Sequence, residues 1–463
     1  MLPITLHEEK IKETMEKAKA GKKWVIAVVT ATKPDFYKQW SILTACEKLG
    51  IPNFVIHTGQ HYDEIVGHGL DEFGLRERFA CDLAVRGELL QKSSELITKI
   101  GWFGKYLKQN WPGVTVLPVV HGDTLVAAVA PIGWMFSRNE KVAQNEAGLR
   151  AMAPNSMKNI SEKPVNVEKF INDQWYGDWH ILRNEPFPEQ WDTFVSGAGS
   201  EFLFAPTELN QEHLLREGYP SDRVFVVGNS IVDAAAAKMK EKSEIGVFDA
   251  YPKLEKKDDW IRVDMHRREN LTPRRFEAII GGVKDLVEKG YNICFIELNA
   301  TKTALEQYGM RKILLDLNKK DNFLFTGVWP KYAHVIEFLN SGKCFAELTD
   351  SGSMQEELNE LGKVACLTCR FSTDRPETVF KAHTNILIPP TSKEWIAKMV
   401  EHVHNSDEIR KTLAKPNKLY GKNVGNKIAK IFLESMANGS RPFRWAHEVL
   451  NLWKEKDLDF SYL

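Results

Sequence analysis

The strongest constraint on the fold is a series of short, continuous apolar runs that recurs along most of the chain. Such runs, bounded by polar turns, are typical of strands buried on both faces of a parallel sheet. Amphipathic segments such as 275–288 separate most of them, and this alternation predicts a doubly wound α/β architecture. The runs lie at residues 24–30, 54–58, 114–120, 142–145, 202–205, 224–227, 261–265, 293–296, 323–325, 344–348, 364–368 and 386–388.

The domain organisation follows from the length and from two interruptions of this rhythm. At roughly 100 to 200 residues per domain, 463 residues predict two domains. A polar stretch predicts a linker between them, and an aperiodic stretch containing two prolines predicts a long inserted loop. We expect two Rossmann-like domains facing a central cleft. The predicted parts are an N-terminal helical extension at 1–21, an N-terminal domain at 22–237 with the insertion 151–184, the linker 238–259, a C-terminal nucleotide-binding domain at 260–420, and C-terminal helices at 421–463 that pack back on the body.

Composition excludes several classes of partner. Lys plus Arg equals Asp plus Glu at 62 each, so no global positive field would attract nucleic acid or an anionic membrane. The longest apolar stretch, 124–136, is too short to span a bilayer, and the polar first residues favour a cytoplasmic location. The six cysteines are scattered, as reduced core thiols would be. Cys366 and Cys369 match C-x-x-C, but no second ligand pair stands nearby in sequence, so core packing is favoured over zinc.

Polar residues follow many of the runs directly, at the sheet edge where ligands of open parallel sheets bind. In the first half these residues are cations after one run and carboxylates after three later segments. In the second half they are cations after one run and a small-residue helix start after another, which favours phosphate. The motifs are ATKPDFYK at 31–38, HGDT at 121–124, NEAGLR at 145–150, PFPE at 186–189, HRRE at 266–269 and SGSMQEE at 351–357.

Each motif alone is more often a turn with a solvated charge pair, but six of them at strand ends in both halves favour a functional site. The segment at 351–357 is not a Walker P-loop, no G-x-G-x-x-G follows the first run, and no G-x-S-x-G is present. Kinases, nicotinamide enzymes and serine hydrolases are therefore disfavoured.

The ordered motifs resemble those of the UDP-N-acetylglucosamine 2-epimerase family over roughly residues 25–388. That resemblance implies the two-domain fold of GT-B glycosyltransferases, with the nucleotide held mainly by the C-terminal domain. It also implies a homodimer that interconverts UDP-N-acetylglucosamine and UDP-N-acetylmannosamine for cell-surface polysaccharide biosynthesis, without metal or nicotinamide. The motifs are GQHYDE, VVHGDT, NEAGLR, EPFPE, FAPTE, LLREGYPSDRVFVVGNSIVDA, HRREN, LTDSGSMQEE and DRPE.

The resemblance also implies roles for individual residues. Inverting C2 of a sugar requires one group to remove a proton and another to return one on the opposite face, and clustered carboxylates would raise the pKa of at least one of them. The implied mechanism eliminates UDP, leaves a glucal-like intermediate and adds UDP back. The implied catalytic residues are Asp123, Glu146, Glu189 and His266. The implied substrate-binding residues are Lys33, Lys38, Arg267, Ser351, Gly352, Ser353, Glu357 and Arg375.

Several motifs depart from the family pattern. G-x-R-P-E is replaced by ATKPD at 31–35, H-V-E-A-G-L-R by QNEAGLR at 144–150, P-E-E-x-N-R by PEQWDT at 188–193, and H-x-N-P by ELNA at 297–300. These changes keep three alternatives open: a hydrolysing 2-epimerase that releases UDP and free N-acetylmannosamine, a GT-B glycosyltransferase, and a binding protein without catalysis. The insertion 151–184 is expected either to cover the sugar pocket as a lid or to pack its aromatic residues onto the surface.

Overall fold

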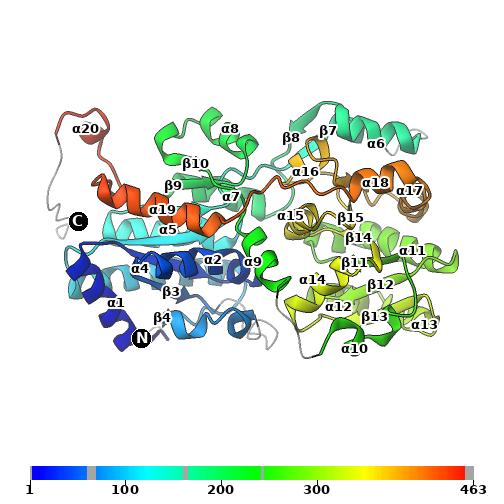
Figure 1. Ribbon diagram of the computed structural model, residues 1–463, viewed down its shortest axis with the longest axis horizontal. Coiled ribbons are helices and arrows are strands. Elements are labelled where there is room, and N and C mark those ends of the chain that lie inside the picture. Colours follow the sequence, from blue (N-terminus) through cyan, green and yellow to red (C-terminus); the bar gives the residue numbers. More distant parts are fainter. Residues whose placement is uncertain (1–2, 60–68, 159, 161–164, 241–244, 454–463) are drawn as a thin grey trace. The chain divides into compact units, whose positions relative to one another are not determined.

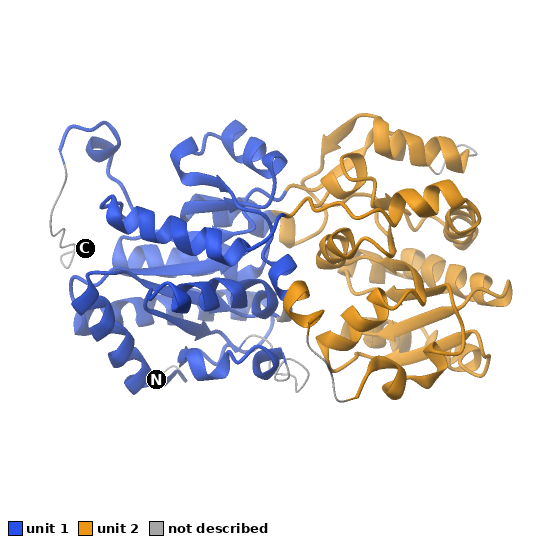
Figure 2. Cartoon of the chain, in the orientation of Figure 1, with its two compact units in different colours: residues 1–149, 191–234, 421–463 blue, residues 150–190, 235–420 orange. Residues whose placement is uncertain are grey.

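The computed structural model describes residues 3–59, 69–158, 160, 165–240 and 245–453 (Figure 1). Of Lys33 and Pro34 it describes the backbone only. The chain forms two compact units (Figure 2). The first unit comprises Met1–Leu149, Trp191–Ala234 and Gly421–Leu463, and the second comprises Arg150–Gln190 and Ala235–Tyr420. The second unit is therefore made of two separate segments of the chain, and the first unit of three.

The first unit is built on an eight-stranded sheet of order β1-β4-β3-β2-β5-β6-β9-β10, parallel except at β1. Every residue of β2, β5 and β9 is buried, as their continuous apolar runs predict. The strands are β1 Thr5–Leu6, β2 Val25–Thr30, β3 Asn53–His57, β4 Phe79–Asp82, β5 Val116–His121, β6 Val142–Asn145, β9 Ser200–Ala205 and β10 Val224–Val226.

Helices flank this sheet. The first-turn residue Asp35 caps α2 by accepting from the backbone N–H of Thr32. The C-terminal helix α19 packs on α2 so closely that a Cβ on Gly425 would collide with the carbonyl oxygen of Ser41. The helices are α1 Glu8–Gly21, α2 Lys33–Lys48, α4 Leu89–Asn110, α5 Leu125–Arg138, α7 Glu189–Ala198, α8 Glu208–Arg216, α9 Ile231–Lys238, α19 Val424–Ala437 and α20 Ala446–Val449, with α7 and α9 crossing the boundaries between the units.

The second unit is built on a six-stranded, fully parallel sheet of order β13-β12-β11-β14-β15-β16. Its strands are β11 Trp260–Asp264, β12 Ile293–Glu297, β13 Phe323–Gly327, β14 Cys344–Thr349, β15 Ala365–Thr368 and β16 Asn385–Leu387. From residue 245 onward its helices are α10 Val247–Ala250, α11 Pro273–Glu288, α12 Asn299–Gln307, α13 Arg311–Leu317, α14 Tyr332–Asn340, α15 Gly352–Leu361, α16 Glu377–Phe380, α17 Lys393–Asn405 and α18 Asp407–Leu413.

The insertion 151–184 differs from the expected loop of the N-terminal domain. It contains β7 Met152–Pro154, α6 Val167–Tyr176 and β8 Trp179–Ile181, and it belongs to the second unit. The segment folds as a helix of the second unit because its apolar residues recur at a helical period. The residues that α6 buries are part of the hydrophobic core around the six-stranded sheet. They are Val167, Phe170, Ile171 and Trp175. Residues 159 and 161–164 lie outside the described residues.

The stretch 238–259 also contains structure. Helix α10 lies within it, and Val247 and Leu254 are buried, so its described part is grouped with the second unit. The C-terminal helices expected within 421–463 are α19 and the short α20, and residues 454–463 lie outside the described part of the chain. All twelve apolar runs are strands, while β1, β4, β7 and β8 were not predicted.

In both sheets the direction of strand winding reverses next to a strand that carries a motif. The reversal lies between β2 and β5 in the first unit and between β11 and β14 in the second. Ligands of open parallel sheets bind at such switch points, beyond the carboxyl ends of the strands. Among the described residues, no helix is long and apolar enough to cross a membrane.

Candidate active site

In the first unit, three strand ends bring a cluster of ionisable side chains together. Asp35 and Lys38 stand on α2 after β2, His121 ends β5 with Asp123 following, and Glu146 follows β6. All five are at least 91% buried. The charges of this cluster must therefore be satisfied within the protein.

Glu146 is the centre of this cluster. Its Oε1 accepts from Lys38 Nζ and from Asn229 Nδ2, and its Oε2 lies 2.8 Å from His121 Nε2. Its backbone adopts φ +61°, a left-handed conformation that is rare outside glycine and concentrates at functional sites. The carboxylate is thus held as an anion in one fixed orientation.

His121 bridges two carboxylates. Its Nδ1 lies 2.7 Å from Asp35 Oδ1, and its Nε2 faces Glu146. Burial opposes the charged imidazolium, but the Glu146 charge and the hydrogen bonds to both carboxylates outweigh it and raise the pKa of His121 to about 9. At neutral pH the ring carries both protons and donates to both partners.

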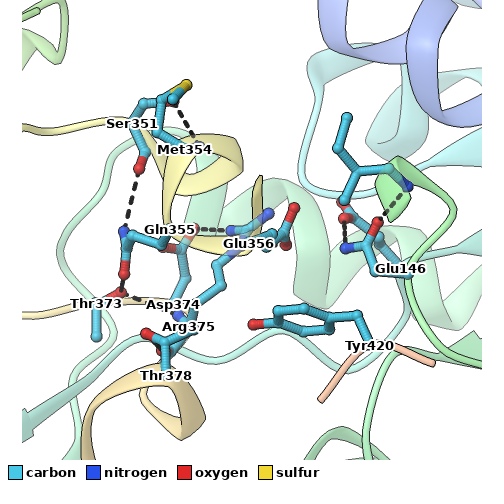
Figure 3. Close-up of polar contacts among 12 residues, drawn as sticks. Glu146, Ser351, Met354, Gln355, Glu356, Thr373, Asp374, Arg375, Thr378 and Tyr420 are labelled. Carbon is cyan, nitrogen blue, oxygen red and sulfur yellow. Dashed lines mark hydrogen bonds and ion pairs between the residues drawn. The ribbon is translucent and has the colours of Figure 1, made fainter. Parts of the chain in front are cut away.

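In the second unit, the start of α15 is the corresponding feature. Ser351 caps the helix by accepting from Met354 N at 3.4 Å, so the first backbone N–H groups point out of the helix end, where an anion is favoured. The Arg375 guanidinium covers this turn, and a Cβ on Gly352 would lie 2.9 Å from its Nη1. Only glycine lets the cation approach the turn this closely. Arg375 is itself oriented by Glu356, at 2.7 Å, and by Asp374 (Figure 3).

His266 and Arg267 follow β11 and are fastened to Asp350, which precedes the α15 turn. Asp350 accepts from the backbone N–H groups of His266 and Arg267 at 2.9 and 3.1 Å and from Asn270 Nδ2 at 3.1 Å. Its Oδ1 lies 3.1 Å from His266 Nδ1. Desolvation opposes the charged form of His266, but the Asp350 charge outweighs it and raises the pKa of His266. Burial would raise the pKa of Asp350, but the charge and hydrogen bond of His266 outweigh burial and lower it. The pair places a cation beside the helix start.

Glu189 also lies in this unit, as the first residue of α7. Its Oε1 is 2.5 Å from Arg267 Nη1, and its side chain is 27% exposed. The preceding segment is fixed by a bidentate pair between Glu185 and Arg275 at 2.9 and 3.1 Å. Glu189 is therefore a partly accessible carboxylate next to a cation.

The two groups of residues have different chemical capacities. The first unit offers carboxylates and an imidazolium that can exchange protons. The second offers N–H groups, guanidinium groups and an imidazolium that can neutralise a leaving anion such as a diphosphate.

Comparison with known proteins identifies the family of this chain. The family model described as UDP-N-acetylglucosamine 2-epimerase matches residues 182–433. A UDP-N-acetylglucosamine 2-epimerase of Methanocaldococcus jannaschii is 32% identical over 391 residues, covering 82% of this chain and 92% of that protein. This chain belongs to the UDP-N-acetylglucosamine 2-epimerase family.

Solved structures agree. The M. jannaschii UDP-GlcNAc 2-epimerase in complex with UDP-GlcNAc and UDP is 27% identical, with a TM-score of 0.70 over 89% of this chain and 99% of that one. The Neisseria meningitidis enzyme bound to UDP-GlcNAc gives a TM-score of 0.69 at 24% identity, over 89% of this chain and 100% of that one. The chain thus has the two parallel-sheet, Rossmann-like domains of GT-B epimerases, as expected.

The structure groups the expected family residues differently from the sequence interpretation in two respects. Glu189 was expected near one sheet edge with Asp123 and Glu146, but it belongs to the second unit, because the chain leaves the first unit after Leu149 and returns at Trp191. Lys38 was expected at the phosphates, yet it is fully buried and ion-paired with Glu146.

Of the other expected residues, Lys33 begins α2 in the first unit, and the rest lie in the second unit, after β11, β14 and β15. Glu357 is buried on α15, where its Oε2 accepts from Tyr332 at 3.0 Å, and Ser353 stands in the first turn of that helix. The side chain of Lys33 and residues 60–64 of the GQHYDE motif lie outside the described residues.

Five further residues of these clusters were not singled out from sequence. They are Asp35, His121, Asn229, Asn270 and Asp350. Four stand inside or directly beside motifs that were recognised, so position in the motif was the available signal. Asn229 also falls within a family motif, but only the fold shows that it meets Glu146. Among the described residues, no group of three or more His, Cys, Asp or Glu could hold a metal ion, and all six cysteines are buried.

Proposed function

We propose that the protein epimerises C2 of a UDP-N-acetylhexosamine, converting UDP-GlcNAc to UDP-ManNAc by elimination and re-addition of UDP. The observation that carries the proposal is the buried Glu146, held by Lys38, Asn229 and His121 inside a protein of this family. Well-packed apolar residues in place of a buried ion pair often leave a protein equally stable or more stable. A buried carboxylate held by three donors therefore favours a chemical role over a purely structural one.

In the first unit we assign proton transfer to Asp123 and Glu146. Asp123 takes or returns the C2 proton, and Lys38 and Asn229 hold the Glu146 carboxylate in place. His121 can supply a proton to that carboxylate, because its ring donates to Glu146 on one side and Asp35 stabilises its charge on the other. Asp35 and Lys38 are positioning residues in this scheme.

In the second unit we assign retention of UDP to the α15 turn. Its backbone N–H groups, Arg375 and His266 would neutralise the diphosphate as the C1–O bond breaks, and Glu357 would receive the ribose. Glu189, assigned by family resemblance, would serve as the second acid/base group, beside Arg267.

The steps balance without a redox cofactor. A base takes the C2 proton while the C1–O bond breaks, giving enzyme-bound UDP and a C1–C2 double bond. UDP then adds back to C1 as an acid protonates C2 from the opposite face, so only the configuration at C2 changes.

Two rivals differ in the fate of the intermediate and of UDP. A hydrolysing 2-epimerase lets water capture the sugar and releases UDP with free ManNAc, whereas a GT-B glycosyltransferase turns over only when an acceptor is supplied. A homodimer is proposed here on family resemblance alone.

One nuclear magnetic resonance assay in deuterated water separates these outcomes. With UDP-GlcNAc as sole substrate, we expect UDP-ManNAc carrying deuterium at C2 and constant total UDP-sugar. Stoichiometric free UDP and ManNAc would favour the hydrolysing reaction, and epimer without deuterium would contradict proton exchange.

A further inference from the structure

The inserted segment 151–184 is bonded to the loop that carries Arg375. Met152 on β7 donates its backbone N–H to Thr373 O at 2.8 Å and accepts from Thr373 N at 2.9 Å. This reciprocal pair joins the segment to residues directly before Asp374 and Arg375. The family model's match begins at residue 182, so β7 and α6 lie outside it.

The Thr373 side chain extends this link to the helix start. Its hydroxyl donates to Gln355 Oε1 at 2.6 Å and accepts from Arg375 N at 3.0 Å. Gln355 in turn donates to Ser351 O at 3.2 Å (Figure 3). A continuous chain of hydrogen bonds therefore runs from β7 to the N-cap of α15 and to the backbone of Arg375.

Helix α6 supplies a second route to Gln355. Trp175 Nε1 donates to Asn385 O at 3.2 Å, and Asn385 Nδ2 donates to Gln355 Oε1 at 2.9 Å. Beside it, Gln174 accepts from Leu387 N at 2.7 Å and donates to Leu387 O at 3.1 Å. Because β16 is the edge strand of its sheet, α6 satisfies backbone groups that would otherwise lack a neighbouring strand.

This network is buried, and the directions of its hydrogen bonds are fixed. Gln174, Gln355, Thr373 and Asn385 are all fully buried. Gln355 Oε1 accepts hydrogen bonds from Thr373 and Asn385, and its Nε2 donates to Ser351 O. The side-chain amide therefore has only one orientation that satisfies all three bonds. Buried, fully connected polar networks hold a unique geometry more strictly than apolar packing does.

We propose that the inserted segment is a positioning element for the diphosphate-binding turn, acting through Thr373 and Gln355 on Ser351 and Arg375. The inference rests on the proposed function, since it assumes that UDP binds at this turn. The contacts of two aromatic residues of the segment favour the packing alternative over the lid: Trp175 stacks on His383 at 5.3 Å, and Trp179 packs edge-on to Phe380 at 5.5 Å.

Two matched pairs of variants test the proposal by calorimetric titration of the full chain with UDP. Thr373→Val removes the hydroxyl and keeps the shape, while Thr373→Ser restores it. Met152→Pro removes the backbone donor to Thr373, while Met152→Ala keeps it. We expect UDP affinity to fall about tenfold in the Val and Pro variants, as for loss of a buried hydrogen bond, and to stay within about twofold in the Ser and Ala variants.

Uridine, followed by ligand-observed magnetic resonance, is the control ligand, because it lacks the phosphates. Positioning predicts that uridine affinity is unchanged while UDP affinity falls, with all variants folded by thermal melting. Equal losses for uridine and UDP, or unchanged UDP affinity in folded Met152→Pro and Thr373→Val, would overturn the inference. If Thr373→Val does not fold, the Met152 pair decides. A wild-type protein that binds no UDP would contradict the proposed function as well, which distinguishes the two failures.

Discussion

The two units satisfy their buried charges in different ways. In the first unit, Asp35, Lys38, His121 and Glu146 pair with one another inside the protein, two anions with two cations. In the second, His266 and Arg375 surround the start of a helix, where a bound anion would find additional N–H donors. A closed charge cluster suits proton transfer, because a carboxylate and an imidazolium can exchange a proton without solvent. A helix start ringed by cations suits binding of a phosphate.

The largest effect is expected from removing an acid/base group of the first unit. Asp123→Asn should lower turnover by about a hundredfold or more, because the amide cannot accept the C2 proton. UDP affinity should stay within about twofold, since the groups proposed to bind the phosphates belong to the other unit. Steady-state kinetics and UDP titration measure the two quantities. Glu212→Gln, at an exposed position of the same unit, is the control. If Asp123→Asn lost turnover and UDP affinity to the same extent, the two units would not have the separate roles proposed for them.

The second prediction tests the helix start. Gly352→Ala would place a Cβ 2.9 Å from Arg375 Nη1, so the guanidinium must move away from the turn. We expect UDP affinity to fall about tenfold, the loss typical of one charge-assisted hydrogen bond. Gly21→Ala, whose Cβ would meet only Lys23 carbons at ordinary contact distances of 3.7 and 3.8 Å, is the matched control. Unchanged UDP affinity in Gly352→Ala would contradict the proposal that the α15 turn binds the diphosphate.

The fold was largely readable from sequence, because continuous apolar runs have few interpretations in a chain of this length. The insertion was misread because its prolines and aromatic residues hid the helical spacing of Val167, Phe170, Ile171 and Trp175. The assignment of residues 150–190 to the second unit could not be read at all. The spacing of apolar residues within a segment predicts its secondary structure but not the sheet against which it packs.

The sequence motifs predict which segments carry the site residues, but not which of those residues contact one another. His121 and Asp35 are 86 residues apart, and nothing in either motif indicates that they pair. The sequence predicts Lys38 to be a phosphate ligand, because a cation directly after a strand is typical of one. Its complete burial against Glu146 depends on the packing of α2, which the sequence pattern does not specify.

The third prediction concerns stability in the first unit. The pKa of His121 is raised from 6.5 to about 9. Its stabilising contribution is therefore complete below pH 6.5 and is lost as pH rises toward 9. His121→Gln should lower the unfolding temperature by on the order of 10 °C at pH 6, and the gap to wild type should narrow by pH 9. Calorimetric scans across this range measure the gap. A gap that is constant with pH would contradict a charged His121.

The smallest effect is expected from Glu377 in the second unit. Desolvation raises its pKa from 4.5 to about 7, although Tyr420 donates to its Oε1 at 2.8 Å. The folded state keeps the proton, so stability is highest below pH 4.5 and falls as pH rises through 7. Glu377→Gln does not titrate and can still accept from Tyr420. Its unfolding temperature relative to wild type should rise by a few degrees between pH 5 and 7.5. No change across that window would contradict a protonated Glu377.

The most direct test of the account follows the bond between C1 and the diphosphate. UDP-GlcNAc labelled with ¹⁸O at the bridging oxygen is incubated with the wild-type protein, and ³¹P resonance reports the position of the label. If UDP leaves C1 and stays bound while the C2 proton is exchanged, the label scrambles into non-bridging positions of the β-phosphate with no accumulation of free UDP. Epimerisation with the label fixed in the bridge would contradict the account, in which UDP leaves C1 and then adds back.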